Sequence, residues 1–365
     1  MIERIYIQNF RCLESFTLRL GSETSALIIG KNGTGKTTTR KALEIFQTIC
    51  RGSGRVGTLV SPDDFAFGRT DRPMRFEIDV IKDGKRFEYA ISFDWPADFR
   101  EARILEERLN VDGIAIFARA QSQVDLAGGA NFGLDWHVFA ISVVNEKPPA
   151  RSIQDLKAYL ASLVLIAPVP TNMKGFSRKT TAELNEDASN YASCLRGLLE
   201  KKPAAYFDFV KFIQSVIPDF SAFEHEDRGK DGKQMMVTFK TPNSEPFTVE
   251  FDALSDGEKC YFLSAYVVAS TAAGFPVVCV WDEPDNHLSL SDVGQFIISL
   301  RQMARRGGQF IATSHHPEVV RKFSDETTFV LTRNSHLDPT LPKVLTDFHY
   351  DGNLIDALIR DEVIG

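Results

Sequence analysis

The spacing of apolar positions divides the chain into strand-like and helix-like segments. Apolar and polar side chains alternate over residues 2–20, which predicts two strands on either side of residues 9–12. The apolar run at residues 26–29 predicts a buried strand. Beyond Lys36 the apolar positions follow one face of a helix, at Ala42, Ile45, Phe46 and Ile49. The chain therefore opens with a strand pair, a buried strand and a helix.

The middle of the chain changes from strand-like to helix-like patterns. Two alternating runs meet at Asp83 and Gly84 and predict a β-hairpin, and residues 103–119 predict a second hairpin. Residues 152–223 are interpreted as mostly helical, with breaks at prolines. The polar segment 226–233 predicts a turn before a further pair of strands.

From residue 254 onward, helices and strands alternate. The pattern predicts helices at residues 258–269, at 291–304 and near Val319, and strands at residues 277–281, 309–314 and 327–332. Strands separated by helices favour a mostly parallel sheet with helices on both faces. The predicted fold class is therefore α/β, with a β-rich lobe and a helical subdomain. We expect four parts, namely 1–57 (first part of the core), 58–150 (β-rich lobe), 151–235 (helical subdomain) and 236–365 (second part of the core).

Composition and charge exclude several classes of protein. Of the 365 residues, 43% are hydrophobic and 25% are charged, which fits a globular chain with a sizeable core. The net charge of −7 argues against a strongly basic nucleic-acid surface. The five cysteines are dispersed and form no CxxC pair, which indicates reduced thiols. The sequence has no signal-peptide core and no apolar run near 18 residues, so we expect a cytoplasmic protein that does not enter a membrane.

Residues 30–37, with the sequence GKNGTGKT, match the phosphate-binding motif G-x-x-x-x-G-K-[ST]. Its glycines let backbone N–H groups turn toward phosphate oxygens, and the helix that follows adds its positive end. Lys36 would reach the β- and γ-phosphates of ATP, and the Thr37 hydroxyl would ligate Mg²⁺. The preceding strand and following helix argue against a chance match. The candidate nucleotide-binding residues are Gly30, Asn32, Gly33, Thr34, Gly35, Lys36, Thr37 and Thr38.

A second candidate site follows the apolar strand at residues 277–281, where Asp282 and Glu283 stand next to each other. Ligands of open α/β sheets collect at the carboxyl ends of the parallel strands. Asp282 is therefore a candidate for the Mg²⁺ shell, and Glu283 is a candidate for polarising the attacking water. Taken alone, two carboxylates at the end of a strand are also common as solvated caps.

Two further segments carry candidate chemistry. In LSDGEK (residues 254–259), Ser255 and Glu258 form a capping box for the next helix, and this Gly257-containing helix start is also a candidate anion site. In IATSHHP (residues 311–317), His315 follows another strand and is a candidate γ-phosphate sensor, although a lone histidine is more often a surface or core residue. His316 is interpreted as exposed, and His287 as part of an inter-subunit loop.

With these motifs in this order, the sequence resembles the ATP-binding-cassette (ABC) ATPases of the structural-maintenance-of-chromosomes (SMC) type. It is most similar to a compact bacterial AAA-family group related to the recombination-repair and overcoming-lysogenization-defect ATPases. The resemblance rests on IQNFRC (residues 7–12), DEPDNHLS (282–289), TSHHPEVV (313–320) and the helical segment 184–203. It covers nearly the whole chain, most weakly over 58–150, and implies the P-loop fold of an ABC-ATPase head.

The resemblance also implies a mechanism. In that family, the signature segment of one subunit caps the nucleotide on the P-loop of another, so that two ATP molecules lie between two heads. It therefore implies a homodimer in which Ser255, Gly257 and Glu258 face the ATP of a second copy and residues 285–287 line the contact. It implies ATP hydrolysis with Glu283 as the water-activating residue and His315 as the switch histidine. The resemblance also implies that Arg11 touches phosphate. Whether the dimers assemble into higher oligomers stays an open question.

The sequence departs from the family pattern in three places. No glutamine loop is recognisable, and Gln121 and Gln123 are candidates only by default. Asp285 stands where the family has a second glutamate. Relatives of the overcoming-lysogenization-defect type carry a nuclease domain after the ATPase, and no acidic cluster of that kind is left here. We therefore expect the effector, a nuclease or a toxin, to be a separate polypeptide.

Three functions stay open at this point. The first is an ATP-hydrolysing switch that dimerises around ATP and controls a partner effector, expected in anti-phage defence. The second is an ATP-gated scaffold or sensor that holds a nuclease or toxin with little turnover. The third is DNA repair through direct DNA binding, which the net charge does not support. Its candidate residues are Lys174, Arg178, Lys179, Arg301, Arg305 and Arg306. A transporter subunit fits poorly, because the spacing from Lys36 to Ser255 is large.

Overall fold

The computed structural model describes residues 1–52, 55–97, 99–146, 150–243, 245–275, 277–323 and 327–348. Contacts between residues divide the chain into two compact units. Unit 1 comprises Met1–Leu163 and Ser324–Gly365, and unit 2 comprises Val164–Phe323. Both units combine β-sheet with helices, so the fold class is α/β, as the sequence predicts. The four-part division by sequence pattern stays a prediction.

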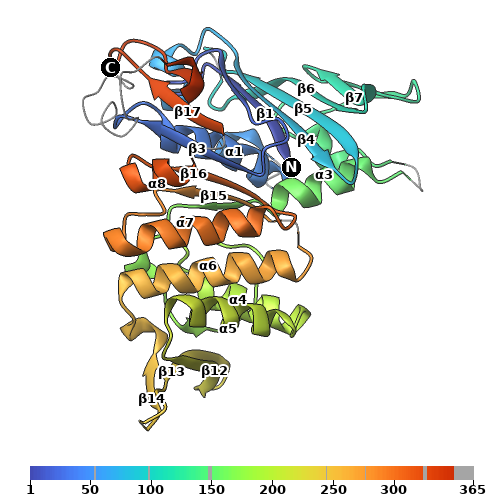
Figure 1. Cartoon of the computed structure of the whole chain (residues 1–365). Helices are drawn as coiled ribbons and strands as arrows, with labels where there is room; N and C mark the ends of the chain where they lie inside the picture. Colours follow the sequence, from blue (N-terminus) through green and yellow to red (C-terminus); the bar gives the residue numbers. More distant parts are fainter. Residues whose placement is uncertain are drawn as a thin grey trace. The chain divides into compact units, whose positions relative to one another are not determined.

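Unit 1 contains an eight-stranded antiparallel sheet with the strand order β2-β1-β4-β5-β6-β7-β8-β9 (Figure 1). The strands are β1 (Ile2–Gln8), β2 (Phe16–Arg19), β4 (Met74–Lys82), β5 (Lys85–Asp94), β6 (Arg103–Val111), β7 (Ile114–Ala120), β8 (Gln123–Leu126) and β9 (Asn131–Gly133). The first strand pair and both hairpins are confirmed. The hairpin turns at Asp83 and Gly84 and at Asp112 and Gly113 have positive φ at both residues, the tight turn geometry that Asp-Gly favours.

Helix α1 (Lys36–Cys50) packs on this unit through its predicted apolar face. The ring of Phe46 meets Phe76 and Tyr89 of the sheet edge to face, at centroid distances of 6.3 and 5.8 Å. Helix α3 (Ser152–Ala161) also packs against α1. Because α1 is anchored by these contacts, the start of the helix is fixed as well.

Three further strands of unit 1 frame the segment that precedes α1. Strand β3 (Ser25–Gly30) is buried along its length and pairs in parallel with β17 (Thr327–Thr332). Strand β18 (Leu341–Val344) pairs with β17 in the antiparallel direction. The predicted strands at residues 26–29 and 327–332 are thus confirmed.

A buried carboxylate of unit 1 has a structural role. Glu107 of β6 accepts hydrogen bonds from the backbone N–H groups of Ala140 (2.6 Å) and Ile141 (2.9 Å), at the start of α2 (Ala140–Val143). It also accepts a hydrogen bond from the Tyr89 hydroxyl at 2.9 Å. Burial raises the pKa of Glu107 above its ordinary value. Because its donors come from the protein itself, we interpret Glu107 as a structural group and not as a catalytic one.

Unit 2 contains three parallel strands, β10 (Val164–Ile166), β15 (Val278–Asp282) and β16 (Gln309–Thr313). Its helices are α4 (Tyr191–Lys201), α5 (Ala205–Val216), α6 (Asp256–Ala272), α7 (Leu290–Ala304) and α8 (Pro317–Lys322). Figure 1 shows α7, α6 and α5 as successive layers, in agreement with their contacts. Helix α6 is buried nearly all round, as its apolar sequence predicts, and its Phe262 meets Phe209 and Phe251 edge to face.

A smaller sheet of unit 2 is built around β13 (Gly232–Phe239). Strand β12 (Phe220–Arg228) pairs with β13 along one side, while β11 (Phe176–Ser177) and β14 (Phe247–Glu250) pair with it on the other. The predicted polar turn over 226–233 is shorter than expected, because β12 ends at Arg228 and β13 begins at Gly232. Short 3₁₀ helices lie at η1 (Val56–Thr58), η2 (Pro62–Asp64), η3 (Ala66–Gly68), η4 (Pro170–Asn172), η5 (Phe251–Ala253) and η6 (Leu345–Asp347).

The prediction of a mostly helical segment over 152–223 was wrong for residues 162–190. That stretch contains β10, β11 and irregular backbone. A three-residue apolar strand is too short for its period to be distinguished from a turn of helix. Only its parallel partner β15, which is distant in the sequence, reveals that β10 is a strand.

In the part of the chain that the structure describes, no helix combines the length and the apolar character needed to cross a membrane. The five cysteines are buried, and none of them is in a disulfide.

Because His225 of β12 has a lowered pKa, we expect the stability of unit 2 to depend on pH. Burial, with Arg196 and Lys233 nearby, lowers the pKa of its ring from 6.5 to about 4. Between pH 6.5 and pH 4, the His225 ring therefore binds a proton in the unfolded chain but not in the folded chain. Its contribution to the free energy of unfolding is fully present above pH 6.5 and is lost as the pH drops toward 4. The loss is at most about 3 kcal/mol, and less where solvent screens the ring. Urea unfolding at pH 7 and pH 4.5 should show a smaller pH effect in His225→Leu.

The exposed histidine His287 offers the matched control. His287→Leu should keep the pH dependence of the wild type. Equal pH effects in His225→Leu and the wild type would contradict the assignment to His225.

Candidate functional site

The loop between β3 and α1 has the backbone geometry of a phosphate-binding loop. Gly33 and Gly35 have φ angles of 83° and 98°, in the left-handed region that favours glycine. A Cβ atom on Gly35 would lie 2.8 Å from Cys12 Sγ, so the loop passes directly against the β1–β2 turn. Gly35 is also the N-cap of α1, with no side-chain cap and no acidic residue in the first turn. The first-turn N–H groups of α1 therefore form an anion-binding helix end.

The predicted lysine lies against this loop. Lys36 Nζ donates hydrogen bonds to the carbonyl oxygens of Gly30 (2.8 Å) and Lys31 (3.4 Å), and the residue is 6% exposed. Thr34 Oγ1 also donates to the Lys31 carbonyl, at 2.8 Å. The side chain of Thr37 is exposed at the start of α1. The local geometry thus combines a cation, an exposed hydroxyl and a helix N-terminus, which is the chemistry that a nucleotide phosphate requires.

Arg11, the predicted phosphate contact, is engaged by a carboxylate. Its Nε and Nη2 lie 2.9 and 2.8 Å from Asp64 Oδ1, and its backbone N–H donates to the Asp64 carbonyl at 2.7 Å. The pKa of Asp64 is lowered by hydrogen bonds from Ser61 and Arg11, which together outweigh the effect of burial. In this structure Arg11 therefore ties the β1–β2 turn to η2, and its phosphate contact stays a prediction.

The acidic half of the predicted site lies in unit 2, at the carboxyl end of β15. Asp282 is the last residue of β15, and Thr313 is its register partner at the end of β16. Thr313 Oγ1 donates a hydrogen bond to Asp282 Oδ1 and accepts one from the Glu283 N–H at 3.0 Å. Thr313 could not be recognised as a partner of Asp282 from the sequence, because this pairing exists only once the two strands lie side by side.

Glu283 has a strained backbone and a held side chain. Its φ of 50° is in the left-handed region, where a bulky residue costs roughly 1–2 kcal/mol. Glu283 Oε2 accepts a hydrogen bond from Asn286 Nδ2 at 2.8 Å, and Oε1 lies 3.5 Å from His315 Nδ1. His315 itself is 58% exposed in its side chain. The structure therefore brings the two predicted catalytic residues together at one edge of unit 2.

The predicted capping box at the start of α6 is confirmed. Ser255 Oγ and the Ser255 N–H both donate to Glu258 Oε2, at 2.7 and 2.8 Å, and the Glu258 N–H donates to Ser255 Oγ at 3.4 Å. A Cβ atom on Gly257 would lie 3.0 Å from the carbonyl oxygen of His287. Within unit 2, the helix start and the loop after Glu283 thus touch, and they touch at a glycine.

Comparisons with known proteins agree with this geometry. The crystal structure of an SMC head bound to the C-terminal winged-helix domain of ScpA has a TM-score of 0.57 and 14% identity, with 95% of this chain and 99% of that chain covered. An SMC head with an extended coiled coil, bound to the C-terminal domain of ScpA derived from Pyrococcus furiosus, has a TM-score of 0.53 and 13% identity. Coverage there is 95% of this chain and 97% of that chain. At this identity the likeness shows the fold, that of an SMC head. No curated protein matches the chain.

Two family models match the sequence itself. The model described as "AAA ATPase domain" matches residues 1–91, which include the P-loop. The model described as "AAA domain, putative AbiEii toxin, Type IV TA system" matches residues 173–321, which include the capped helix start, the acidic pair and His315. Two parts of the chain thus match models of AAA-family domains, and its fold is that of an SMC head. The family resemblance and the fold class inferred from the sequence are therefore confirmed.

Two residues differ from the sequence-based interpretation. Asp285 was expected to line a contact between subunits, but it is 7% exposed and accepts a hydrogen bond from Ser314 Oγ at 2.8 Å. Its carboxylate therefore forms a hydrogen bond in the interior of unit 2. The neighbouring loop residues Asn286 and His287 are exposed. His316 was interpreted as exposed, but its Nδ1 caps α8 by accepting a hydrogen bond from the Glu318 N–H at 3.1 Å.

The structure does not support the two default candidates for the glutamine loop. Gln121 and Gln123 lie at the β7–β8 turn, and the P-loop lies against the β1–β2 turn. Strands β1 and β8 are separated by five strand-to-strand steps, or about 24 Å. In unit 2, the loop after β10 begins at the same edge as Asp282, because β10 and β15 are parallel neighbours. That loop contains the polar residues Thr171 and Asn172 and no glutamine.

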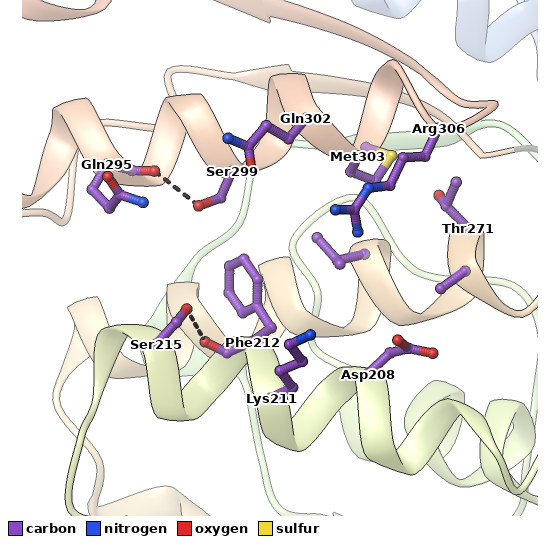
Figure 2. Close-up of a pocket in the computed structure, with 12 residues that line it drawn as sticks. Asp208, Lys211, Phe212, Ser215, Thr271, Gln295, Ser299, Gln302, Met303 and Arg306 are labelled. Atoms are coloured by element: carbon purple, nitrogen blue, oxygen red, sulfur yellow. Dashed lines mark hydrogen bonds between the residues drawn. The ribbon is translucent and has the colours of Figure 1, made fainter.

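A hollow of about 290 Å³ in unit 2 lies between α5, α6 and α7 (Figure 2). Its hydroxyl groups are used by their own helices, since Ser215 Oγ donates to the Phe212 carbonyl (2.6 Å) and Ser299 Oγ to the Gln295 carbonyl (2.9 Å). Figure 2 shows charges of both signs around the hollow, from Asp208, Lys211 and Arg306. Because the Asp208 carboxylate lies among these charges, we do not assign phosphate binding to the hollow.

Proposed function

We propose that this protein binds ATP with Mg²⁺ and hydrolyses it. The observation that carries the proposal is Glu283, which keeps a strained left-handed backbone and a carboxylate held by Asn286, close to His315. Strain of this kind persists only where the surrounding structure imposes it, and it clusters at functional sites. The matches of residues 1–91 and 173–321 to AAA-family models and the P-loop motif of unit 1 support the same conclusion.

Each residue has a role in the proposed reaction. Lys36 and the first-turn N–H groups of α1 bind the phosphates, because the ammonium supplies positive charge and the N–H groups supply hydrogen-bond donors. Glu283 takes a proton from the attacking water, and His315 donates a hydrogen bond to the terminal phosphate. Thr313 is a positioning residue, since it contacts Asp282 and the backbone of Glu283 and no reacting atom.

The two predicted ligands are of the kind that Mg²⁺ takes. Thr37 of unit 1 carries a hydroxyl and Asp282 of unit 2 carries a carboxylate, and Mg²⁺ commonly takes one or two such hard oxygen ligands together with phosphates and waters. In the described residues, no group of three or more His, Cys, Asp or Glu side chains forms a metal site by itself. Bound there, Mg²⁺ would neutralise charge that develops on the phosphate oxygens.

We also propose that two copies close around the nucleotides. The start of α6 is a part of unit 2 that could face a phosphate from outside, because Ser255 and Asp256 are exposed at this helix end. The loop with exposed Asn286 and His287 lies directly beside it. This arrangement supports a contact in which the helix start of one copy meets the P-loop of the other.

The partner of the switch is proposed to be a separate effector protein. The similar SMC heads are bound to a domain of ScpA, so a head of this fold can present a surface to another protein. The family description that names a putative AbiEii toxin motivates a nuclease or toxin in anti-phage defence as the effector. Of the six candidate DNA-binding residues, Arg301 is 8% exposed and lies over the ring of Phe323, whereas the other five are exposed. Direct DNA binding is not the function proposed, because the net charge of −7 does not favour it.

Phosphate release and light scattering test the proposal together. With Mg²⁺, the wild type should release phosphate from ATP, and excess EDTA should stop the release. ATP should shift the mass from monomer toward dimer, and ADP should not. Nucleotide binding without turnover would favour the ATP-gated scaffold, and absence of nucleotide binding would contradict the proposal as a whole.

A further inference from the structure

The loop between β17 and β18 lies against the P-loop within unit 1. Arg333 Nη1 donates a hydrogen bond to the Gly33 carbonyl at 3.1 Å, and Thr340 Oγ1 donates one to the Thr34 carbonyl at 2.8 Å. The Thr340 N–H also donates to the Cys12 carbonyl at 2.9 Å, and Thr340 is fully buried. Two side chains about 300 residues downstream therefore hold the backbone of the P-loop.

These contacts fall on the carbonyl side of the P-loop. A loop that points its N–H groups at a phosphate must point its carbonyl groups elsewhere, and those carbonyls need donors of their own. In this structure, the Gly30 and Lys31 carbonyls accept from Lys36, and the Gly35 carbonyl accepts from Thr39. Arg333 and Thr340 supply donors for two of the carbonyls between these, those of Gly33 and Thr34.

The supporting loop is itself well ordered by internal bonds. Arg333 Nε donates to the Asp338 carbonyl at 2.8 Å, and Nη2 donates to the His336 carbonyl at 2.6 Å. Ser335 Oγ donates to Asp338 Oδ2 at 2.7 Å. The planar guanidinium thus fastens its own loop with two N–H groups and the P-loop with a third, a geometry that a lysine cannot reproduce.

We propose that Arg333 and Thr340 are positioning residues that hold the P-loop in its phosphate-binding conformation and so set the affinity for ATP. The inference rests on the proposed ATP binding. Both donors come from the protein itself, so the backbone of the loop is held by contacts within unit 1, and preorganisation of this kind raises affinity. Neither residue touches the reacting atoms, so the rate of hydrolysis at saturation depends on other groups.

The test compares near-isosteric variants in a titration with fluorescent mant-ATP and Mg²⁺. Thr340→Val removes one buried donor and should raise the Kd about tenfold, while Thr340→Ser keeps the hydroxyl and should restore most of the affinity. Arg333→Ala should raise the Kd by a similar factor or more, with Arg333→Lys in between. Thr332→Val is the matched control, because Thr332 Oγ1 donates to the Leu341 carbonyl within the same hairpin and not to the P-loop.

Steady-state kinetics and melting separate positioning from mere stability. Positioning predicts a raised KM with kcat within about twofold of the wild type, and rescue by Thr340→Ser. A lowered melting temperature with unchanged Kd in Thr340→Val and Arg333→Ala would overturn the inference. If instead the wild type and Lys36→Ala both fail to bind mant-ATP, the proposed function itself fails and the inference falls with it.

Discussion

Glu283→Gln should reduce ATP turnover about 10²- to 10⁴-fold while nucleotide binding is kept. The amide has nearly the shape of the carboxylate but cannot take a proton from water at neutral pH. Glu283 Oε2 accepts from Asn286, and a glutamine oxygen can accept the same bond. The variant should therefore fold, bind ATP and stall before hydrolysis.

The same variant should accumulate the ATP-bound dimer, because hydrolysis is the step that we propose opens it. Light scattering in the presence of ATP and Mg²⁺ should give a stable dimer for Glu283→Gln and a mixture for the wild type. Glu250→Gln is the control for loss of a carboxylate in unit 2, since Glu250 is paired with Arg228 at 2.5 Å on the surface. Turnover of Glu283→Gln close to that of the wild type would remove Glu283 from the mechanism.

Glu283→Gly separates the chemistry from the backbone strain at the same position. Glycine adopts a φ of 50° without the steric cost that glutamate meets there. The glycine variant should therefore lose turnover. Its free energy of unfolding should be at least that of the wild type and should exceed it by at most roughly 1 kcal/mol. Urea unfolding of the wild type, Glu283→Gln and Glu283→Gly measures this difference in the free energy of unfolding. A destabilised glycine variant would indicate that the contacts of the side chain with Asn286 and His315 outweigh the strain.

Lys36→Ala is the second large effect that we expect, with a loss of ATP affinity of about 100-fold or more. A charge-assisted hydrogen bond is worth about 1.5–3 kcal/mol, and the ammonium can serve two phosphate groups. The buried Gly30 carbonyl also loses its donor at 2.8 Å, so the loop itself becomes less ordered. Titration with mant-ATP, followed by phosphate release at saturating ATP, measures both consequences.

Lys31→Ala is the matched control for Lys36→Ala. Lys31 belongs to the same loop and has the same charge, but it stands at a variable position of the motif and its residue is exposed. Its loss should change the affinity no more than about threefold, since surface charges contribute little. If both lysine variants lose affinity equally, net charge near the loop accounts for binding, and the specific role of Lys36 is wrong.

The sequence by itself determined the elements whose chemistry is local. The GKNGTGKT loop between an apolar strand and an amphipathic helix, the Ser255–Glu258 capping box and the Asp-Gly hairpin turn all depend on residues within one or two turns of chain. Asp282, Glu283 and His315 could be predicted because each follows an apolar strand, and parallel strands end at a common edge. For such features, side-chain spacing and backbone preference are sufficient information.

Only the tertiary structure decided the features that depend on pairing between distant segments. β10 is too short to be recognised until β15 lies beside it, and Thr313 meets Asp282 only through the register of β15 and β16. The sequence predicts Asp285 to be a surface residue of a polar loop, but its carboxylate is buried and accepts a hydrogen bond from Ser314 Oγ. Arg333 and Thr340 reach the P-loop because β17 pairs in parallel with β3, which brings the β17–β18 loop next to Gly33 and Thr34. A hydrogen bond between residues far apart in sequence leaves no periodic trace in the chain, because its two partners are selected by the fold and not by their neighbours.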